Sequence, residues 1–111
     1  MLRGNITAIL ARNETCTGHA ATEPFEAGWA TEAVIFVRAP KPPVGPRTVA
    51  RIRISPDRMH WADEGTRLDL PTSEGELRLA RVQGFGNWLR LAAGFPDGAS
   101  ACVLVTLHLK G

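Results

Sequence analysis

The stretch "SACVLVTLHLKG", residues 100–111, decides the fold of this 111-residue chain. Apolar residues occupy every second position of it: Ala101, Val103, Val105, Leu107 and Leu109. A period of two places these side chains on one face of a β-strand. Cys102 and Leu104 make part of the other face apolar as well. The stretch therefore predicts a strand that buries one side and offers a locally apolar second side to a covering partner.

The same alternation recurs upstream. In residues 48–55, Ala50, Ile52 and Ile54 are expected to point inward, and Arg51 and Arg53 outward. Leu89 and Leu91 form an inward face in residues 87–92. Residues 33–37 are continuously apolar, which favours a central strand covered on both faces. Further strands are expected at residues 4–11, 59–64, 66–71 and 76–82.

Turn signals separate these strands. Pro96, Asp97 and Gly98 predict a turn that joins the last two strands in a hairpin, and residues 63–65 predict another hairpin turn. The four prolines of residues 39–46 predict a connection between two sheets. Residues 19–30 suit a loop or an edge strand. The sequence thus predicts an all-β fold: a two-sheet antiparallel β-sandwich of jelly-roll or Greek-key type, with seven to nine short strands in a single domain, 1–111.

The segment "RISPDRMHW", residues 53–61, combines the end of a strand with a proline, an acid and a tryptophan. Ser55 and Asp57 are residue types whose side chains hydrogen-bond to nearby backbone, and Trp61 is a common packing residue. We interpret the segment as a structural turn braced by Ser55 and Asp57, with Trp61 packed against it.

Composition limits the classes of partner. The formal net charge of +2 is too small for the strong field of a non-specific nucleic-acid binder. No stretch reaches the roughly 20 apolar residues of a membrane span, and the N-terminal segment has no signal-peptide core. We expect synthesis in the cytoplasm, followed by incorporation into a particle or export without a Sec signal. Cys16 and Cys102 allow one disulfide, and spacing does not decide whether they pair.

No catalytic constellation is visible. His19, His60 and His108 lie outside any nucleophile-elbow or zinc-protease motif, and the acids lie mostly in or beside predicted turns. Residues 57–65 lack the oxygen-ligand spacing of a calcium loop. The sequence therefore predicts a protein that is not an enzyme, with no catalytic residues, no metal ligands and no cofactor.

Two sets of residues suit binding. Arg51, Arg53, Arg78 and Arg90 would form a basic stripe across one sheet, suited to phosphate, an acidic polysaccharide or an acidic neighbouring subunit. Trp29, Trp61 and Trp88 would form a platform for sugar rings. Arginine stems that cover the sheet and tryptophans that fill a core are the structural alternatives.

Residues 50–111 carry a family resemblance. A strand ending in "SPD" at 55–57, followed by Trp61, "GNWLRL" at 86–91 and a closing "LHLKG", resembles small jelly-roll-like β-sandwich modules of phage and prophage structural proteins and of bacterial surface or carbohydrate-binding proteins. Those modules have a glycine where Arg58 stands here. The resemblance implies a sandwich that assembles or binds, with no catalytic residues carried over.

Our leading hypothesis is a non-enzymatic assembly module, phage-particle-like, that associates with itself as a homo-oligomer, a trimer among the possibilities, or docks to a larger protein scaffold. The alternative hypothesis is a carbohydrate-binding module that uses exposed tryptophans and binds polysaccharide as a monomer.

Overall fold

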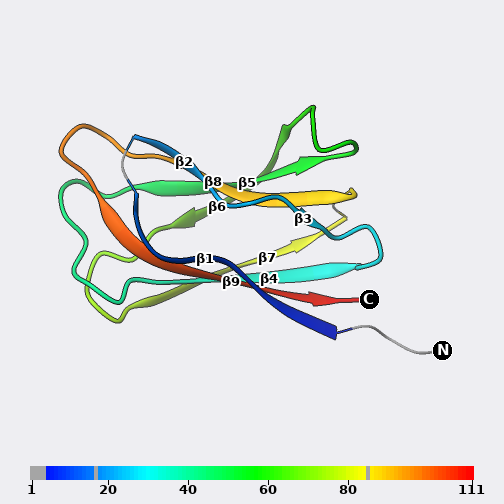
Figure 1. Cartoon of the computed structure of the whole chain (residues 1–111), viewed down its shortest axis with the longest axis horizontal. Coiled ribbons are helices and arrows are strands. Elements are labelled where there is room, and N and C mark those ends of the chain that lie inside the picture. Colours follow the sequence, from blue (N-terminus) through cyan, green and yellow to red (C-terminus); the bar gives the residue numbers. More distant parts are fainter. Residues whose placement is uncertain (1–4, 17, 85) are drawn as a thin grey trace.

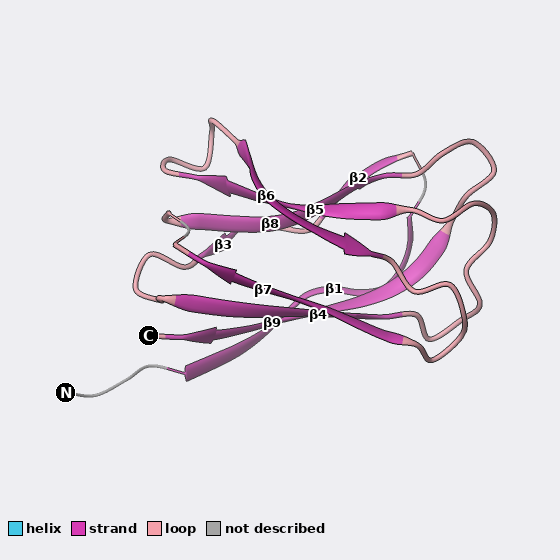
Figure 2. Cartoon of the chain, turned by 180° about the vertical axis from the view of Figure 1, so that it is seen from behind, coloured by secondary structure: helices cyan, strands magenta, loops and turns pink. Residues whose placement is uncertain are grey.

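The computed structural model describes the backbone of residues 5–16, 18–84 and 86–111, and the side chains of residues 18–84 and 86–111. Nine strands form two antiparallel sheets, and no helix occurs in these residues (Figures 1 and 2). The strands are β1 (Asn5–Cys16), β2 (His19–Ala21), β3 (Phe25–Glu26), β4 (Glu32–Arg38), β5 (Val49–Ser55), β6 (Ala62–Asp69), β7 (Leu77–Gln83), β8 (Trp88–Gly94) and β9 (Ala101–Lys110). The predicted all-β sandwich is confirmed.

The strand order is that of a jelly roll. Sheet A has the order β1-β9-β4-β7, and sheet B has the order β2-β8-β5-β6, with β3 also paired to β8. If β2 and β3 are counted as one interrupted strand, the chain crosses between the sheets at every connection except the β5–β6 hairpin. Its first and last strands then lie side by side, as in double Greek-key jelly rolls.

The core lies between the sheets and follows the predicted alternation. Its fully buried large apolar side chains are Ile35, Val37, Ile52, Val82, Leu89, Val105, Leu107 and Leu109. β4 lies between β9 and β7, so its predicted central position is confirmed. Its outward residues Val34 and Phe36 are only half-buried, so the side chains that the structure describes do not cover its second face as expected.

Two predicted hairpins are wrong. Pro96 accepts a backbone hydrogen bond from Ala99 at 2.9 Å, and Gly98 has a φ of 80°, so a turn is present at residues 96–99. The strands on either side of it, β8 and β9, nevertheless lie in different sheets. The other expected turn, residues 63–65, lies inside β6, where the register with β5 shifts between Arg51 and Arg53. In both places turn-forming residues bend the chain without pairing the flanking segments.

The proline-rich connection behaves as predicted. Residues 39–48 carry the chain from β4 in sheet A to β5 in sheet B. Val44 forms an isolated antiparallel bridge with Ser100, so this connection lies against the connection between β8 and β9. Contact between these two connections closes one end of the sandwich. At residues 19–26, β2 and β3 lie along the outer side of β8, in agreement with the expected edge strand.

Candidate functional site

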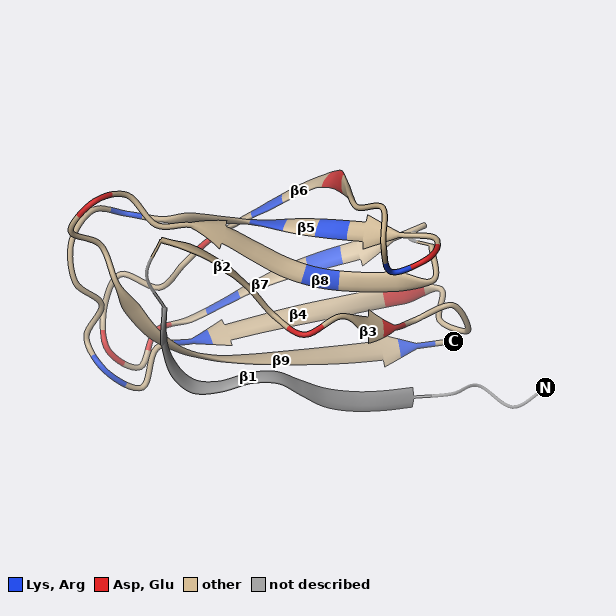
Figure 3. Cartoon of the chain, turned by 45° about the horizontal axis from the view of Figure 1, so that its top comes forward, with Lys and Arg blue, Asp and Glu red and all other residues tan. Residues whose placement is uncertain are grey.

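The outward face of sheet B collects arginines from three strands. Arg51 on β5 is directly opposite Arg67 on β6, and Arg53 on β5 is directly opposite Arg90 on β8. These residues share one face because directly opposed residues in an antiparallel pair point to the same side of the sheet. Figure 3 shows their basic bands across β5, β6 and β8. The predicted stripe therefore includes Arg51, Arg53 and Arg90, and Arg67 joins it.

Arg78 does not belong to this stripe. It alternates with Leu77 and Leu79 on β7 of sheet A, on the same side as the buried Ala80. Its Nη2 atom lies 3.0 Å from a carboxylate oxygen of Glu76. The expectation that Arg78 points outward beside Arg51 and Arg53 is wrong, because β7 presents its leucines to the outside and turns its arginine toward the rim of the core.

Two tryptophans are stacked with arginines at the end of this face where the β5–β6 turn lies. The guanidinium carbon of Arg90 lies 4.1 Å from the centroid of the Trp61 ring, and that of Arg58 lies 5.2 Å from the centroid of Trp88. Arg53 Nη2 donates to the carbonyl of Trp61 at 3.3 Å. Trp61 Nε1 donates to the carbonyl of Arg58 at 3.1 Å. These contacts fix the orientation of the guanidinium groups and cover one face of each ring.

The turn that carries Trp61 is held by side-chain hydrogen bonds. Ser55, buried at the end of β5, accepts from the backbone N–H of Asp57 at 3.2 Å and of Arg58 at 2.8 Å, and it donates to Asp57 Oδ1 at 3.1 Å. Asp57 Oδ1 in turn accepts from the backbone N–H groups of Met59 and His60. Arg58 has a φ of 69°, the left-handed conformation that glycine adopts most easily. An arginine thus occupies the glycine position of the turn.

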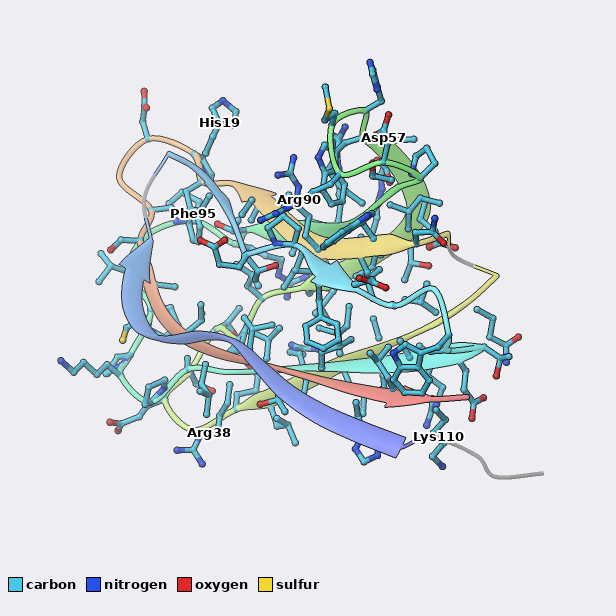
Figure 4. The ribbon with its side chains drawn as sticks, turned by 45° about the vertical axis from the view of Figure 1, so that its right-hand side comes forward. His19, Arg38, Asp57, Arg90, Phe95 and Lys110 are labelled. Atoms are coloured by element: carbon cyan, nitrogen blue, oxygen red, sulfur yellow. The ribbon has the colours of Figure 1, made fainter. Side chains whose placement is uncertain are left out.

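The electrostatics of the turn favour an ionised aspartate. The backbone N–H of His60 is the main group that lowers the pKa of Asp57, and the His60 ring, whose Nδ1 lies 2.6 Å from Oδ2, lowers it further. Hydrogen bonds to a carboxylate stabilise its charged form. The negative charge of Asp57 is therefore retained, on the same side of the sandwich as Arg90 (Figure 4).

Ser55, Asp57 and His60 are the residue types of a catalytic triad, in the wrong order. In a triad the histidine lies between the serine and the acid and removes the hydroxyl proton. Here the aspartate lies between the other two, and the serine hydroxyl is buried and used in the turn. Within the residues that the structure describes, no three His, Cys, Asp or Glu side chains form a potential metal site. The geometry suits turn formation rather than proton transfer.

A hollow of about 570 Å³ adjoins the arginines. Its cationic lining comes from Arg51, Arg53 and Arg90, with His19 at the β2 side. The remaining lining consists of small or apolar residues: Ala20, Ala21, Val49, Ala92, Ala93 and Gly94. Figure 4 shows Arg90 and His19 on the same side of the sandwich, opposite Arg38 and Lys110. We call this feature the cationic hollow.

The other candidate residues lie elsewhere. Trp29, 40% exposed, is in the β3–β4 connection and lies against Gly111. Pro96, Asp97 and Gly98 form the turn between the two sheets. Cys102 carries a free thiol and is buried; the side chain of Cys16 lies outside the described residues. Of the three tryptophans proposed as a platform, only Trp61 and Trp88 share a face.

Sequence reasoning missed three contributors to this face. Arg67 and His19 could be assigned to it only from strand register, because they reach it from β6 and β2. The sequence marks Arg58 only as a departure from the glycine of the similar modules. Its ring partner, Trp88, is 30 residues away in the sequence, so no local pattern connects them.

No protein-family model matches the chain, and no curated protein matches its sequence. Solved structures with a similar fold include YomS and XepA. The SPBc2 prophage-derived protein YomS has a TM-score of 0.63 and 9% identity, over 100% of this chain and 96% of that one. The PBSX exported protein XepA has a TM-score of 0.58 and 11% identity, over 97% of this chain and 36% of XepA. The predicted resemblance to phage-derived proteins is confirmed at the level of the fold.

Proposed function

We propose that this protein is a non-enzymatic, phage-associated assembly module that associates with itself through the outward face of sheet A. The likeness to prophage-derived folds and the use of Ser55, Asp57 and His60 in a turn support a role without catalysis. No helix in the described residues is long and apolar enough to cross a membrane. A place in a particle, or export from the cell, is part of the proposal.

The observation that carries the proposal is an apolar patch on sheet A. Leu77 and Leu79 of β7 are 55% and 43% exposed. Phe36 of β4 is directly opposite Leu79, and Val34 and Leu104 lie half-buried on the same face. Contiguous exposed apolar surface on a protein commonly marks an interaction site. We call these five residues the apolar patch.

The positions of two charges on β4 fit a second copy of the chain as the occupant of the patch, while Arg81 and Lys110 add positive charge to the same face. Along the outward side of β4, Glu32 lies at one end, Arg38 at the other, and Val34 and Phe36 between them. A two-fold contact between two such faces, with the β4 strands antiparallel, would bring Glu32 of each copy to Arg38 of the other. Isologous contacts need this self-complementary pattern. A larger scaffold protein remains a second partner for the same patch.

The carbohydrate-binding alternative has less support. Sugar stacking needs an open aromatic face, and the faces of Trp61 and Trp88 that meet Arg90 and Arg58 are occupied. The Trp29 ring lies against Gly111, which follows β9 of sheet A.

Solution mass tests the proposal. Size-exclusion chromatography with light scattering, at two concentrations, should give a multiple of the 12.0 kDa chain mass. The Leu77→Ser/Leu79→Ser double variant should shift the protein to monomer. Met59→Ser is the matched control, because Met59 is 78% exposed in the β5–β6 turn and outside the apolar patch. A wild-type monomer at both concentrations, or an oligomer that survives the double variant, would overturn self-association through this face.

A further inference from the structure

The cationic hollow brings together three guanidinium groups that form no ion pair within the described residues. In residues 18–84 and 86–111, ion pairs are formed by Arg47, Arg78 and His60. Arg51, Arg53 and Arg90, which line the hollow, form none there. Arg53 and Arg90 are also directly opposed, an arrangement of like charges that destabilises a sheet. Asp63 is opposite Arg53 on its other side, but it forms no ion pair with Arg53 and does not line the hollow. An anion from outside the chain would relieve this repulsion.

The side chains around the hollow determine the chemistry of its ligand. Apart from the His19 ring, every polar side chain in the lining is an arginine, which donates hydrogen bonds and accepts none. A neutral sugar needs acceptors as well as donors for its hydroxyl groups. A carboxylate or phosphate needs donors only, and the planar guanidinium fork matches either in a bidentate contact. The hollow therefore suits an oxyanion.

Two of the three arginines are already oriented. Arg90 is stacked on Trp61 at 4.1 Å, and Arg53 donates to the carbonyl of the same tryptophan. The Nε atoms of Arg53 and Arg90 are buried and have no hydrogen-bond partner among the described residues. Because the stems are fixed, a ligand would lose little side-chain entropy on binding to the terminal nitrogens.

The remaining lining distinguishes between oxyanions. Val49, Ala20, Ala21 and Ala92 present apolar surface beside the arginines. That surface suits the methylene groups of acidic side chains and has no counterpart in a phosphate backbone. A volume of about 570 Å³ also exceeds what a single small anion fills. We propose that the cationic hollow binds an acidic peptide segment of a partner protein, with its carboxylates on Arg51, Arg53 and Arg90. This inference goes beyond the proposed self-association and does not depend on it.

The test is a titration of the ¹⁵N-labelled full chain with a capped peptide of eight glutamates at physiological salt. Amide shifts should concentrate on β5, β8 and β2 and include the Trp61 indole N–H. Arg51→Gln should weaken binding about tenfold, the effect of losing one charge-assisted contact. It is the cleanest variant, because Arg51 is exposed and forms no hydrogen bond in the described residues. Arg81→Gln on sheet A is the matched control, with the same change in charge, and should bind like wild type.

Three results would overturn the inference. Equal weakening by Arg51→Gln and Arg81→Gln would mean general charge attraction. Tighter, Arg51-dependent binding of inorganic phosphate or heparin would identify a phosphate or glycan site instead. Absence of saturable peptide binding would also reject the site. The Leu77→Ser/Leu79→Ser variant, titrated in parallel, separates the two proposals, because it should retain peptide binding whatever its oligomeric state.

Discussion

Arg51 of β5 and Arg67 of β6 lie directly opposite each other on the outward face of sheet B, and both are exposed. Like charges in this position destabilise an antiparallel pair. Asp69, two residues along β6 from Arg67, is paired with Arg47 at 3.6 Å instead. This pair and the opposed Arg53 and Arg90 give the face a cationic surface. The repulsion within each pair lowers the stability of the fold, and such a cost is typical of binding surfaces.

Arg67→Glu should stabilise the protein. It replaces a repulsive cross-strand pair by an attractive one, and we expect the free energy of unfolding to rise by about 0.5 kcal/mol at low salt. The gain should shrink in about 1 M salt, where the Debye length falls to roughly 3 Å. Urea unfolding followed by tryptophan fluorescence at both salt concentrations measures this, with Arg67→Gln as the neutral intermediate. A gain that is independent of salt would show that the repulsion is not its source.

The Arg58→Gly variant of the protein should be more stable than the Arg58→Ala variant. Both variants remove the guanidinium from Trp88 and keep the N–H that donates to Ser55, so they differ only in the backbone preference at a φ of 69°. The left-handed conformation costs a non-glycine residue roughly 1–2 kcal/mol. We expect Arg58→Gly to exceed Arg58→Ala in unfolding free energy by about 1 kcal/mol. Equal stabilities would mean that the turn relaxes out of this conformation.

Acid should weaken the β5–β6 turn through Asp57. Hydrogen bonds from the backbone N–H of His60, from the His60 ring and from Met59 lower the pKa of Asp57 in the folded state below its ordinary value of 3.8. The resulting stability is present above that ordinary value and is lost as the pH falls toward the folded-state pKa. The stability difference between wild type and Asp57→Asn should therefore decrease from about pH 5 to about pH 2.

Asp97→Asn is the control for this pH dependence. Asp97 lies in the turn at residues 96–99 and forms no hydrogen bond or ion pair in the described part of the chain. Its variant should follow the wild-type pH profile. A constant difference between wild type and Asp57→Asn over the same range would contradict the assignment to Asp57.

Gly45→Ala should destabilise the closed end of the sandwich. A Cβ at Gly45 would lie 2.3 Å from the carbonyl oxygen of Gly98 and 2.7 Å from the Cα of Ala99. Gly75→Ala is the matched control, since it has a similar positive φ and no atom within 4 Å of its added Cβ. Steric overlap typically costs roughly 1–3 kcal/mol, so Gly45→Ala should lose about that much more than Gly75→Ala in thermal or urea unfolding. Equal losses would show that the two connections can move apart.

Strand positions could be predicted from the sequence because they depend on a local period. Arg51, Ile52 and Arg53 alternate between solvent and core as expected, and so do the residues of β9. The sheet to which each strand belongs could not be predicted in this way. Residues 96–98 bend the chain by their own backbone preferences, but β9 pairs with β1 and β4 because its apolar face completes the core there.

In the candidate site, too, local periodicity could be predicted from the sequence and strand pairing could not. Arg51, Arg53, Trp61 and Trp88 could be selected from the sequence by residue type and outward position. The stack of Arg90 on Trp61 joins residues 29 apart, and it exists because β5 is paired with both β6 and β8. The sequence by itself determined that side chains alternate between two faces, because that follows from a two-residue period, but on β7 it did not determine which face is outward, and Arg78 points inward. Only the tertiary structure decided which outward side chains meet, because strand pairing between distant segments sets their neighbours.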